Sequence, residues 1–207
     1  LHESGRRGSV VLDRCGSHSG TRTSGRHQRA RYTDVTAPGM TSAIEIRDAV
    51  PDDHPRIIEL NTLAVRHTSP MHAIRLLELQ ALSDCNWVIT VDGAVAGFLL
   101  AMREHADYAN LNYDYFAVRY PMFLYIDRIV IAPEHAGLKL GTRLYQALFA
   151  KARSERVPMV VCEYNIEPPN EASRRFHDKF GFREIGTQWL DGGRKKVSLQ
   201  AAATGQA

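Results

Sequence analysis

The pattern of apolar positions divides the chain near residue 40. Residues 1–39 are rich in Gly, Ser, Thr and Arg and show almost no apolar periodicity. Such a segment cannot bury enough surface to offset the entropy that it would lose on ordering. From Met40 onward, apolar residues recur at the spacings of strands and amphipathic helices. We therefore predict a disordered basic extension over 1–39, a globular domain over 40–202 and a flexible tail over 203–207.

Apolar runs of strand character predict about seven strands in the domain. The clearest run is FLYIDRIVIA, over 123–132, which stops before Pro133. Two further runs, 87–91 and 94–102, are joined by Asp92-Gly93, a strong signal for a two-residue hairpin turn. The remaining strands are expected over 43–48, 159–163, 182–188 and 196–199.

Between these strands, apolar residues three and four positions apart predict about four helices. They are expected over about 51–64, 74–82, 138–153 and 171–180. A Tyr- and Asn-rich stretch, 105–120, follows neither period and stays unassigned. The order is a strand, two helices, three strands, a helix, a strand, a helix and two strands. This order predicts an α/β (α+β) fold in which helices cover the faces of a mixed sheet.

Composition agrees with a single domain. With 207 residues, 44% of them hydrophobic, the chain can bury one good core. No apolar run approaches the roughly 18 residues of a membrane-spanning helix, and the first residues lack the apolar stretch of a signal peptide. We therefore expect a cytoplasmic protein with no membrane partner. Three scattered cysteines, and nine histidines without paired ligand spacing, favour neither disulfides nor a metal site.

The positive charge is concentrated ahead of the predicted domain. The formal net charge is +3, but residues 1–39 carry seven arginines against three acids, so the remainder is close to neutral. A near-neutral domain is not typical of nucleic-acid binding. A basic arm that contacts RNA or acidic lipid is the alternative to a solvated tail. We favour the tail and expect no nucleic-acid partner.

The segment IVIAPEHAGLKLGTRL, over 129–144, is the first that carries chemical information. A strand ends there at Pro133, and a helix begins near Leu140. Backbone N–H groups at such a junction are unpaired and, together with the helix dipole, attract anions. Gly137 and Gly141 would let a ligand approach the backbone closely. The pattern indicates a phosphate site, with an ordinary helix start as the alternative.

The segment NEASRRFHDKFGF, over 170–182, is the second informative one. A helix is expected to end at Gly181, just before a strand. His177, near the end of this helix, is a titratable side chain that could deliver a proton. A solvated helix residue is the alternative for His177. By its spacing, Phe176 is expected to pack in the core.

Together these two segments resemble the GNAT acetyltransferases. The family's pyrophosphate loop reads Gln/Arg-x-x-Gly-x-Gly/Ala after a strand that ends in a proline, and residues 136–141 occupy that stretch. Gly141 matches the pattern, whereas Ala136 and Lys139 depart from it. The family's second motif begins Asn-x-x-Ala/Ser and ends Gly-Phe, as residues 170–182 do.

The resemblance implies transfer of an acetyl group from acetyl-CoA to a primary amine by direct attack. The sheet would be mostly antiparallel, and the strands 123–132 and 159–163 would part to admit the pantetheine arm. His177 stands where the family usually has tyrosine, and by resemblance it would protonate the departing thiolate. A homodimer is compatible with the family. The implied cofactor-binding positions are Ile129, Val130, Ile131, Ala136, Gly137, Leu138, Lys139, Leu140, Gly141, Thr142, Asn170, Ser173 and Phe176.

The attacking amine arrives as an ammonium ion, so a base is needed. Asp127 interrupts an apolar strand, where a carboxylate is costly unless it is paired or exposed in a cleft, and it is the first candidate. An ion pair with Arg128 is the alternative for Asp127. Glu163 and Tyr125 are the next candidates, although Glu163 could equally be a rim carboxylate. Substrate contacts are expected from residues 67–72, 107–120 and 188–194.

A small-molecule amine or amino acid is the favoured acceptor. One alternative is a protein N-terminal or lysine acetyltransferase. Another is a regulatory module that binds acyl-CoA without catalysis, which the altered loop at Ala136 and Lys139 and the missing tyrosine at His177 motivate.

Overall fold

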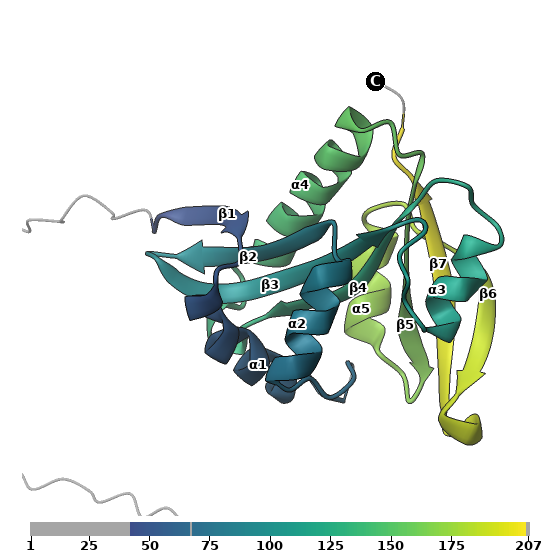
Figure 1. The fold of residues 1–207 in the computed structure, drawn as a ribbon, viewed down its shortest axis with the longest axis horizontal. Helices are drawn as coiled ribbons and strands as arrows, with labels where there is room; N and C mark the ends of the chain where they lie inside the picture. The colour runs from purple at the N-terminus through teal and green to yellow at the C-terminus, as the bar shows by residue number, and fades with distance from the viewer. Residues whose placement is uncertain (1–41, 67, 206–207) are drawn as a thin grey trace, which may run out of the picture. The chain divides into compact units, whose positions relative to one another are not determined.

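A computed structural model of the chain describes residues 42–66 and 68–205, so the predicted extension over 1–39 lies outside the described residues (Figure 1). The strands are β1 (Ile44–Asp48), β2 (Cys85–Val91), β3 (Ala94–Arg103), β4 (Leu124–Ile131), β5 (Met159–Glu167), β6 (Arg183–Leu190) and β7 (Lys195–Ala203). They form one sheet in the order β1-β2-β3-β4-β5-β7-β6. Neighbours are antiparallel except β4 and β5, which run parallel. The predicted mixed, mostly antiparallel sheet is therefore confirmed.

Helices cover both faces of this sheet. They are α1 (His54–Leu63), α2 (Ala73–Leu82), α3 (Leu111–Ala117), α4 (Leu140–Ser154) and α5 (Glu171–Asp178), with short 3-10 turns η1 (Pro51–Asp53), η2 (Pro133–His135) and η3 (Asp191–Gly193). The four predicted helices correspond to α1, α2, α4 and α5. Within the described residues, no helix has the length and apolar character needed to cross a membrane.

The period of two along the central strands divides the core into two layers. On β3, Leu100 packs in the cluster that holds the buried faces of α1, α2 and α3, whereas its neighbour Leu99 packs in the cluster that holds α4. Successive side chains of a strand point to opposite faces of the sheet, so a strand buried on both sides is apolar throughout. This explains why the sequence of β3 is almost entirely apolar and why that of β4 is apolar on both sides of Asp127 and Arg128.

Helix α3 lies in the stretch 105–120 that the sequence left unassigned. Asn110 caps it, because its side-chain Oδ1 accepts hydrogen bonds from the N–H groups of Asn112 and Tyr113. The apolar face consists of aromatic residues, with Tyr113 and Phe116 buried in the first core layer. Seven residues are too few to establish a helical period, and tertiary packing holds the helix in place.

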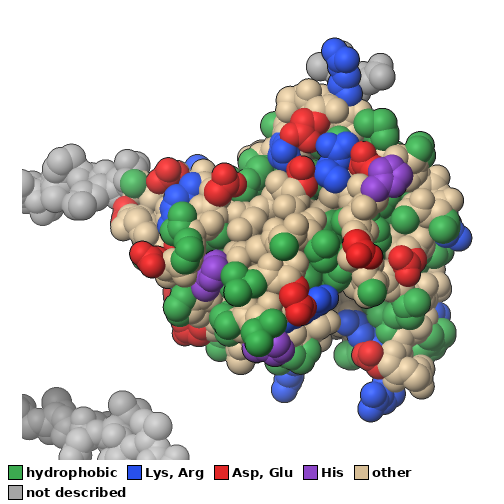
Figure 2. All heavy atoms as spheres, viewed as in Figure 1, with side chains coloured by type: hydrophobic (Ala, Val, Ile, Leu, Met, Phe, Trp, Pro, Cys, Tyr) green, Lys and Arg blue, Asp and Glu red, His purple; other side chains and the backbone are tan. Residues whose placement is uncertain are grey.

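Two strands extend four residues beyond their predicted ends, at 163 and 199. β5 runs to Glu167, past the expected end at residue 163, because it pairs with β7 through Asn165 and Glu167. β7 runs to Ala203, one residue into the segment that we assigned to the tail. The face seen in Figure 2 carries Lys, Arg, Asp and Glu side chains scattered among apolar ones, without a continuous basic area.

Candidate active site

The parallel strands β4 and β5 part after one short contact. They pair only at Leu124–Val160 and Tyr125–Val161. Beyond these pairs, β4 continues along β3 and β5 continues along β7. Residues of β4 after Tyr125 therefore face β5 without pairing to it, which is the separation that the resemblance implied.

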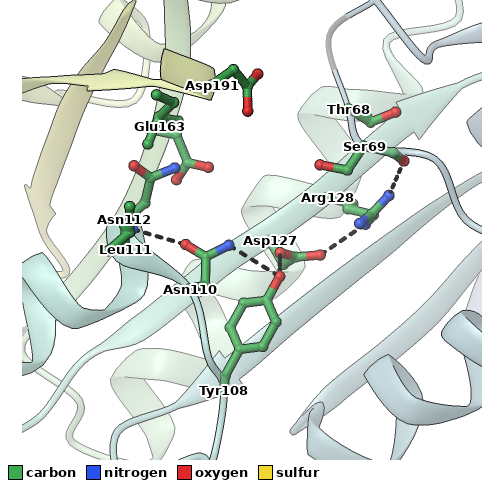
Figure 3. A pocket seen from close by; sticks show the side chains of 11 residues that line it. Thr68, Ser69, Tyr108, Asn110, Leu111, Asn112, Asp127, Arg128, Glu163 and Asp191 are labelled. Atoms are coloured by element: carbon green, nitrogen blue, oxygen red, sulfur yellow. Dashed lines mark hydrogen bonds and ion pairs between the residues drawn. The ribbon is translucent and has the colours of Figure 1, made fainter. Parts of the chain in front are cut away.

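Two cavities adjoin this separation. The larger has a volume of about 740 Å³ and is lined by the second half of β4, the loop at η2, the start of α4 and α5. The smaller has a volume of about 210 Å³ and is lined by the segment before α3, the turn at η3 and the same two strands (Figure 3). Four residues line both cavities: Thr68, Asp127, Arg128 and Glu163. The cavities therefore meet where the two strands part.

The cofactor-binding positions expected from the sequence line the larger cavity, with one exception. Leu138 lies outside the lining, and its side chain is 41% exposed. It stands between Gly137 and Lys139, whose φ angles are 93° and 57°. This left-handed turn accompanies a lining that includes both neighbours, while Leu138 is exposed, so its place among the cofactor-binding positions stays a prediction.

The start of α4 supplies backbone donors to the larger cavity. The N–H of Arg143 donates to the carbonyl of Lys139, 3.1 Å away. It is the first N–H of α4 that donates to the carbonyl four residues before it. The N–H groups of Leu140, Gly141 and Thr142 precede this bond, and all three residues line the cavity. Unpaired N–H groups at the positive end of a helix dipole form an anion site. The geometry suits a phosphate group.

Lys139 occupies the position at which the family pattern has glycine. Its backbone is left-handed, with φ 57° and ψ 28°, at the N-cap of α4. A side chain in this conformation costs roughly 1–2 kcal/mol, which glycine avoids. The loop therefore keeps its shape without the glycine and gains a cation beside the anion site.

His177 is buried and fully hydrogen-bonded. Its Nδ1 lies 2.7 Å from the carbonyl oxygen of Ser173, and a carbonyl only accepts, so we assign the ring hydrogen to Nδ1. Nε2 then accepts a hydrogen bond from the hydroxyl of Tyr145, 2.9 Å away. The ring is 4% exposed, so the solvated alternative is wrong.

This environment changes the expected chemistry of His177. Desolvation by burial lowers the pKa of the imidazole, which keeps the ring neutral near pH 7. Nε2 in this tautomer has no hydrogen to give. His177 is therefore not arranged as the direct proton donor that the resemblance suggested. In its hydrogen bond with Tyr145, the tyrosine hydroxyl is the donor.

Asp127 takes the ion-pair alternative. Its Oδ2 pairs with Nε of Arg128 at 2.9 Å, and its Oδ1 accepts a 2.6 Å hydrogen bond from the hydroxyl of Tyr108. The side chains of Asp127 and Arg128 are each 5% exposed. Arg128 also donates through Nη1 to Asn61 Oδ1 and to the carbonyl of Ser69. Both carboxylate oxygens of Asp127 are thus engaged, which makes it a weaker base candidate than its place in the strand predicted.

A β-bulge places Asp127 in this position. Arg128 pairs with Leu100 and Ile126 pairs with Ala101, so Asp127 is the extra residue on β4. Bulges re-aim side chains and bend the strand. This one brings the carboxylate and the guanidinium of consecutive residues to the same point, where the two cavities meet.

Glu163 has the properties of a base. Its Oε1 accepts a 3.1 Å hydrogen bond from the hydroxyl of Tyr125. Its Oε2 is covered from solvent, although other atoms of the residue are partly exposed, and it is the one buried side-chain N or O atom among the described residues without a hydrogen-bond partner. Burial, reinforced by the negative charge of Asp127, raises the pKa of Glu163 to about 7. Tyr125 is a donor to Glu163, so it is not itself the base.

The segments expected to contact substrate supply most of the smaller cavity. They contribute Thr68, Ser69, Tyr108, Asn110, Leu111, Asn112, Leu190 and Asp191. Residue 67 lies outside the described residues. The sequence analysis missed Tyr145, Cys162 and Tyr164 in the larger cavity. Tyr145 repeats at the spacing of the core positions of α4, a signal that does not distinguish a cavity residue from a packing residue.

Comparison with known proteins places the chain in a family. Residues 46–182 match the model of the acetyltransferase (GNAT) family. The chain belongs to the GNAT family. This confirms the resemblance that was inferred from the two motifs.

Individual relatives agree with this membership. Phosphinothricin N-acetyltransferase of Streptomyces coelicolor is 39% identical over 67 residues, which span 32% of this chain but only 37% of that protein. 5-NmdU N-acetyltransferase of Pseudomonas phage PaMx11 is 27% identical over 146 residues, 69% of this chain and 89% of that protein. Among solved structures, the ribosomal-protein-S18-alanine N-acetyltransferase of Escherichia coli has a TM-score of 0.60 at 17% identity, covering 80% and 96% of the two chains. At this identity, the structural likeness concerns the fold.

The larger cavity fits the cosubstrate of the GNAT family, acetyl-CoA. The N–H groups at the start of α4 suit a pyrophosphate. The strand edge at Ile129, Val130 and Ile131 offers backbone groups for an extended arm, and this edge leads directly to Asp127 and Glu163. No group of three or more potential metal ligands gathers among residues 42–66 and 68–205.

Proposed function

We propose that this protein is an acetyl-CoA-dependent N-acetyltransferase that transfers the acetyl group to the primary amine of a small molecule by direct attack. The observation that carries the proposal is the meeting of two cavities at the parted strands. The larger one suits acetyl-CoA, and the smaller one shares Asp127 and Glu163 with it. Two substrates that enter separate cavities and meet at one point can react without a covalent enzyme intermediate.

When bound, acetyl-CoA supplies a thioester carbonyl that is open to nucleophilic attack. The backbone N–H groups of β4 that face away from β3 donate to this region and stabilise developing negative charge. Glu163, which lines both cavities, accepts the proton of the incoming ammonium ion. Asp127 stays fixed by Arg128 and Tyr108 and holds the ammonium group near Glu163 by its charge.

The pKa of Glu163 suits this task. A carboxyl group with a pKa of about 7 is substantially ionised at neutral pH and is a stronger base than an ordinary glutamate. Tyr145 lines the larger cavity and is the candidate proton source for the thiolate. Its hydrogen would have to leave the bond to His177, and burial raises the pKa of its hydroxyl well above the ordinary value.

The size of the smaller cavity favours a small-molecule acceptor. Its volume of about 210 Å³ is small beside the roughly 300–1,000 Å³ of typical small-molecule pockets. A peptide acceptor needs room for several residues in extended conformation, at up to about 3.5 Å per residue. A small amine needs only the cavity itself.

The test is acetyl-CoA binding and free-thiol release by the full chain across a panel of small amines, amino acids and peptides. We expect saturable binding and amine-dependent thiol release, abolished by Glu163→Gln and retained by Glu167→Gln, an exposed carboxylate on the same strand. Saturable binding without thiol release from any acceptor would indicate the regulatory acyl-CoA-binding module instead. Release with peptides alone would indicate a protein acetyltransferase.

A further inference from the structure

The smaller cavity presents hydrogen-bond acceptors and negative charge to its occupant. Three carboxylates line it, those of Asp127, Glu163 and Asp191, against one cation, Arg128 (Figure 3). The guanidinium of Arg128 already serves Asp127, Asn61 and Ser69. The positive charge that an anionic ligand would need is therefore neutralised within the protein.

Three further cations lie near the cavity but outside its lining. The guanidinium carbon of Arg75 is 5.7 Å from the centre of the Tyr108 ring, and Arg75 is paired at 2.9 Å with Glu78 on the same helix. Arg194 donates through Nε to the carbonyl of Asp191, and Lys195 follows it in the chain. The lining itself carries three carboxylates and one arginine when Glu163 is ionised.

Asp191 is the carboxylate that the proposed reaction does not use. It begins η3, the turn between β6 and β7, and its backbone is left-handed with φ 51°. Its carbonyl accepts a 2.9 Å hydrogen bond from Nε of Arg194, which fixes the turn. Its carboxylate forms no hydrogen bond or ion pair with any residue in 42–66 or 68–205, and it lies at the cavity on the side of Glu163 (Figure 3).

We infer that the acceptor is a short diamine: one amino group reacts at Glu163 and a second cationic group pairs with Asp191, while acceptors with an anionic group are disfavoured. This inference rests on the proposed function and names the substrate class of the same site. A cationic group on the substrate would face the unpaired carboxylate of Asp191, whereas an anionic group would face two or three carboxylates of a lining whose one cation, Arg128, is already paired. Asp191 is thus a specificity-determining residue.

The neutral groups of the cavity are consistent with a short chain between two cationic ends. Asn110 and Tyr108 bond to each other, and Asn112 accepts a hydrogen bond from Gln188. These polar side chains are occupied mainly with each other. Leu111 and Leu190 add apolar surface that methylene groups can contact.

The test is a matched four-carbon series that differs only at the far end: 1,4-diaminobutane, 4-aminobutanol, butylamine and 4-aminobutanoate. We expect kcat/KM for thiol release by the full chain to fall in that order. Asp191→Asn should lower kcat/KM for the diamine about three- to tenfold, leave butylamine unchanged and raise 4-aminobutanoate. Asparagine also tolerates the left-handed backbone, so the turn should be preserved. Since the pair is exposed, added salt should reduce the preference for the diamine.

The outcomes separate this inference from the proposed function. Two results would overturn the diamine acceptor but leave the proposed N-acetyltransferase activity intact. One is a higher kcat/KM for 4-aminobutanoate than for 1,4-diaminobutane. The other is an Asp191→Asn variant that changes kcat/KM for the diamine and for butylamine equally. Failure of every amine in the series, with thiol release from another small amine, would also overturn it alone. The absence of thiol release from all acceptors despite acetyl-CoA binding would overturn both.

Discussion

The hydroxyl of Tyr145 lies 2.9 Å from Nε2 of His177, and this bond determines what the histidine can do. The opposite ring nitrogen is 2.7 Å from the carbonyl of Ser173, so the hydrogen is on Nδ1 and Nε2 accepts. A histidine in the family's tyrosine position is thus joined to a tyrosine contributed by a different helix, and both residues line the larger cavity.

Removing this hydroxyl should destabilise the fold. Tyr145→Phe leaves Nε2 of a buried imidazole without a donor, which costs about 1–3 kcal/mol. Urea unfolding of the variant against the parent protein measures it. The control is Tyr120→Phe, whose hydroxyl has no hydrogen bond to the described residues, and it should change stability by less than about 0.5 kcal/mol. Equal losses in the two variants would contradict the bond.

Burial of His177 also predicts a pH dependence of stability. The pKa of the folded ring is lowered from 6.5, so below that pH the unfolded chain takes up a proton that the folded chain does not. The contribution of His177 is therefore fully present above pH 6.5 and is lost as the pH drops below it, whereas the raised pKa of Glu163 acts in the opposite direction, so the comparison of the variant with the parent protein isolates the histidine. The slope of Tm between pH 7.5 and 5.5 should shrink in His177→Gln. It should persist in His105→Asn, a change at an exposed histidine; an unchanged slope in His177→Gln would contradict the assignment.

The left-handed backbone of Lys139 predicts a difference between two variants that both lose its charge. Lys139→Gly removes the strain that a side chain causes at a φ of 57°, whereas Lys139→Ala retains that strain. The glycine variant should be more stable than the alanine variant by about 1 kcal/mol in urea unfolding. Acetyl-CoA affinity should fall in both, because each removes a cation beside the anion site. An alanine variant as stable as the glycine variant would show that the loop is not left-handed at this position.

The ion pair between Asp127 and Arg128 should contribute more to stability than any exposed carboxylate. Asp127→Asn preserves the shape but leaves a guanidinium that is 5% exposed without its counter-ion, which costs about 3 kcal/mol. Asp107→Asn, at an exposed site, serves as the control and should be within about 0.5 kcal/mol of the parent protein. If Asp127→Asn lowered the free energy of unfolding by as little as the control does, Asp127 would again be the first candidate for the base.

Most of the fold could be read from the sequence because its strands are long and apolar and Asp92-Gly93 marks a hairpin. Helix α3 could not, because seven residues with an aromatic apolar face do not establish a helical period. At the site, the two motifs indicated the cavity wall from Ile129 to Thr142. The contacts that lead us to propose Glu163 in place of Asp127 as the base were hidden, because they depend on a bulge in β4 and on the ion pair with Arg128. The Tyr145–His177 bond joins residues 32 positions apart, which no local pattern reveals.

The most direct test of the account is the pH profile of kcat/KM for amine-dependent thiol release by the full chain, measured for the parent protein, Glu163→Gln and Glu167→Gln. A base must be ionised to accept a proton, and the pKa of Glu163 is raised to about 7. The account predicts a rate that rises with pH through about 7 in the parent protein and in Glu167→Gln. In Glu163→Gln, the rate should be at least about 100-fold lower, which is close to abolition, and should lose this rise. An unchanged rate and profile in Glu163→Gln would contradict the assignment of Glu163 as the base at the meeting point of the two cavities.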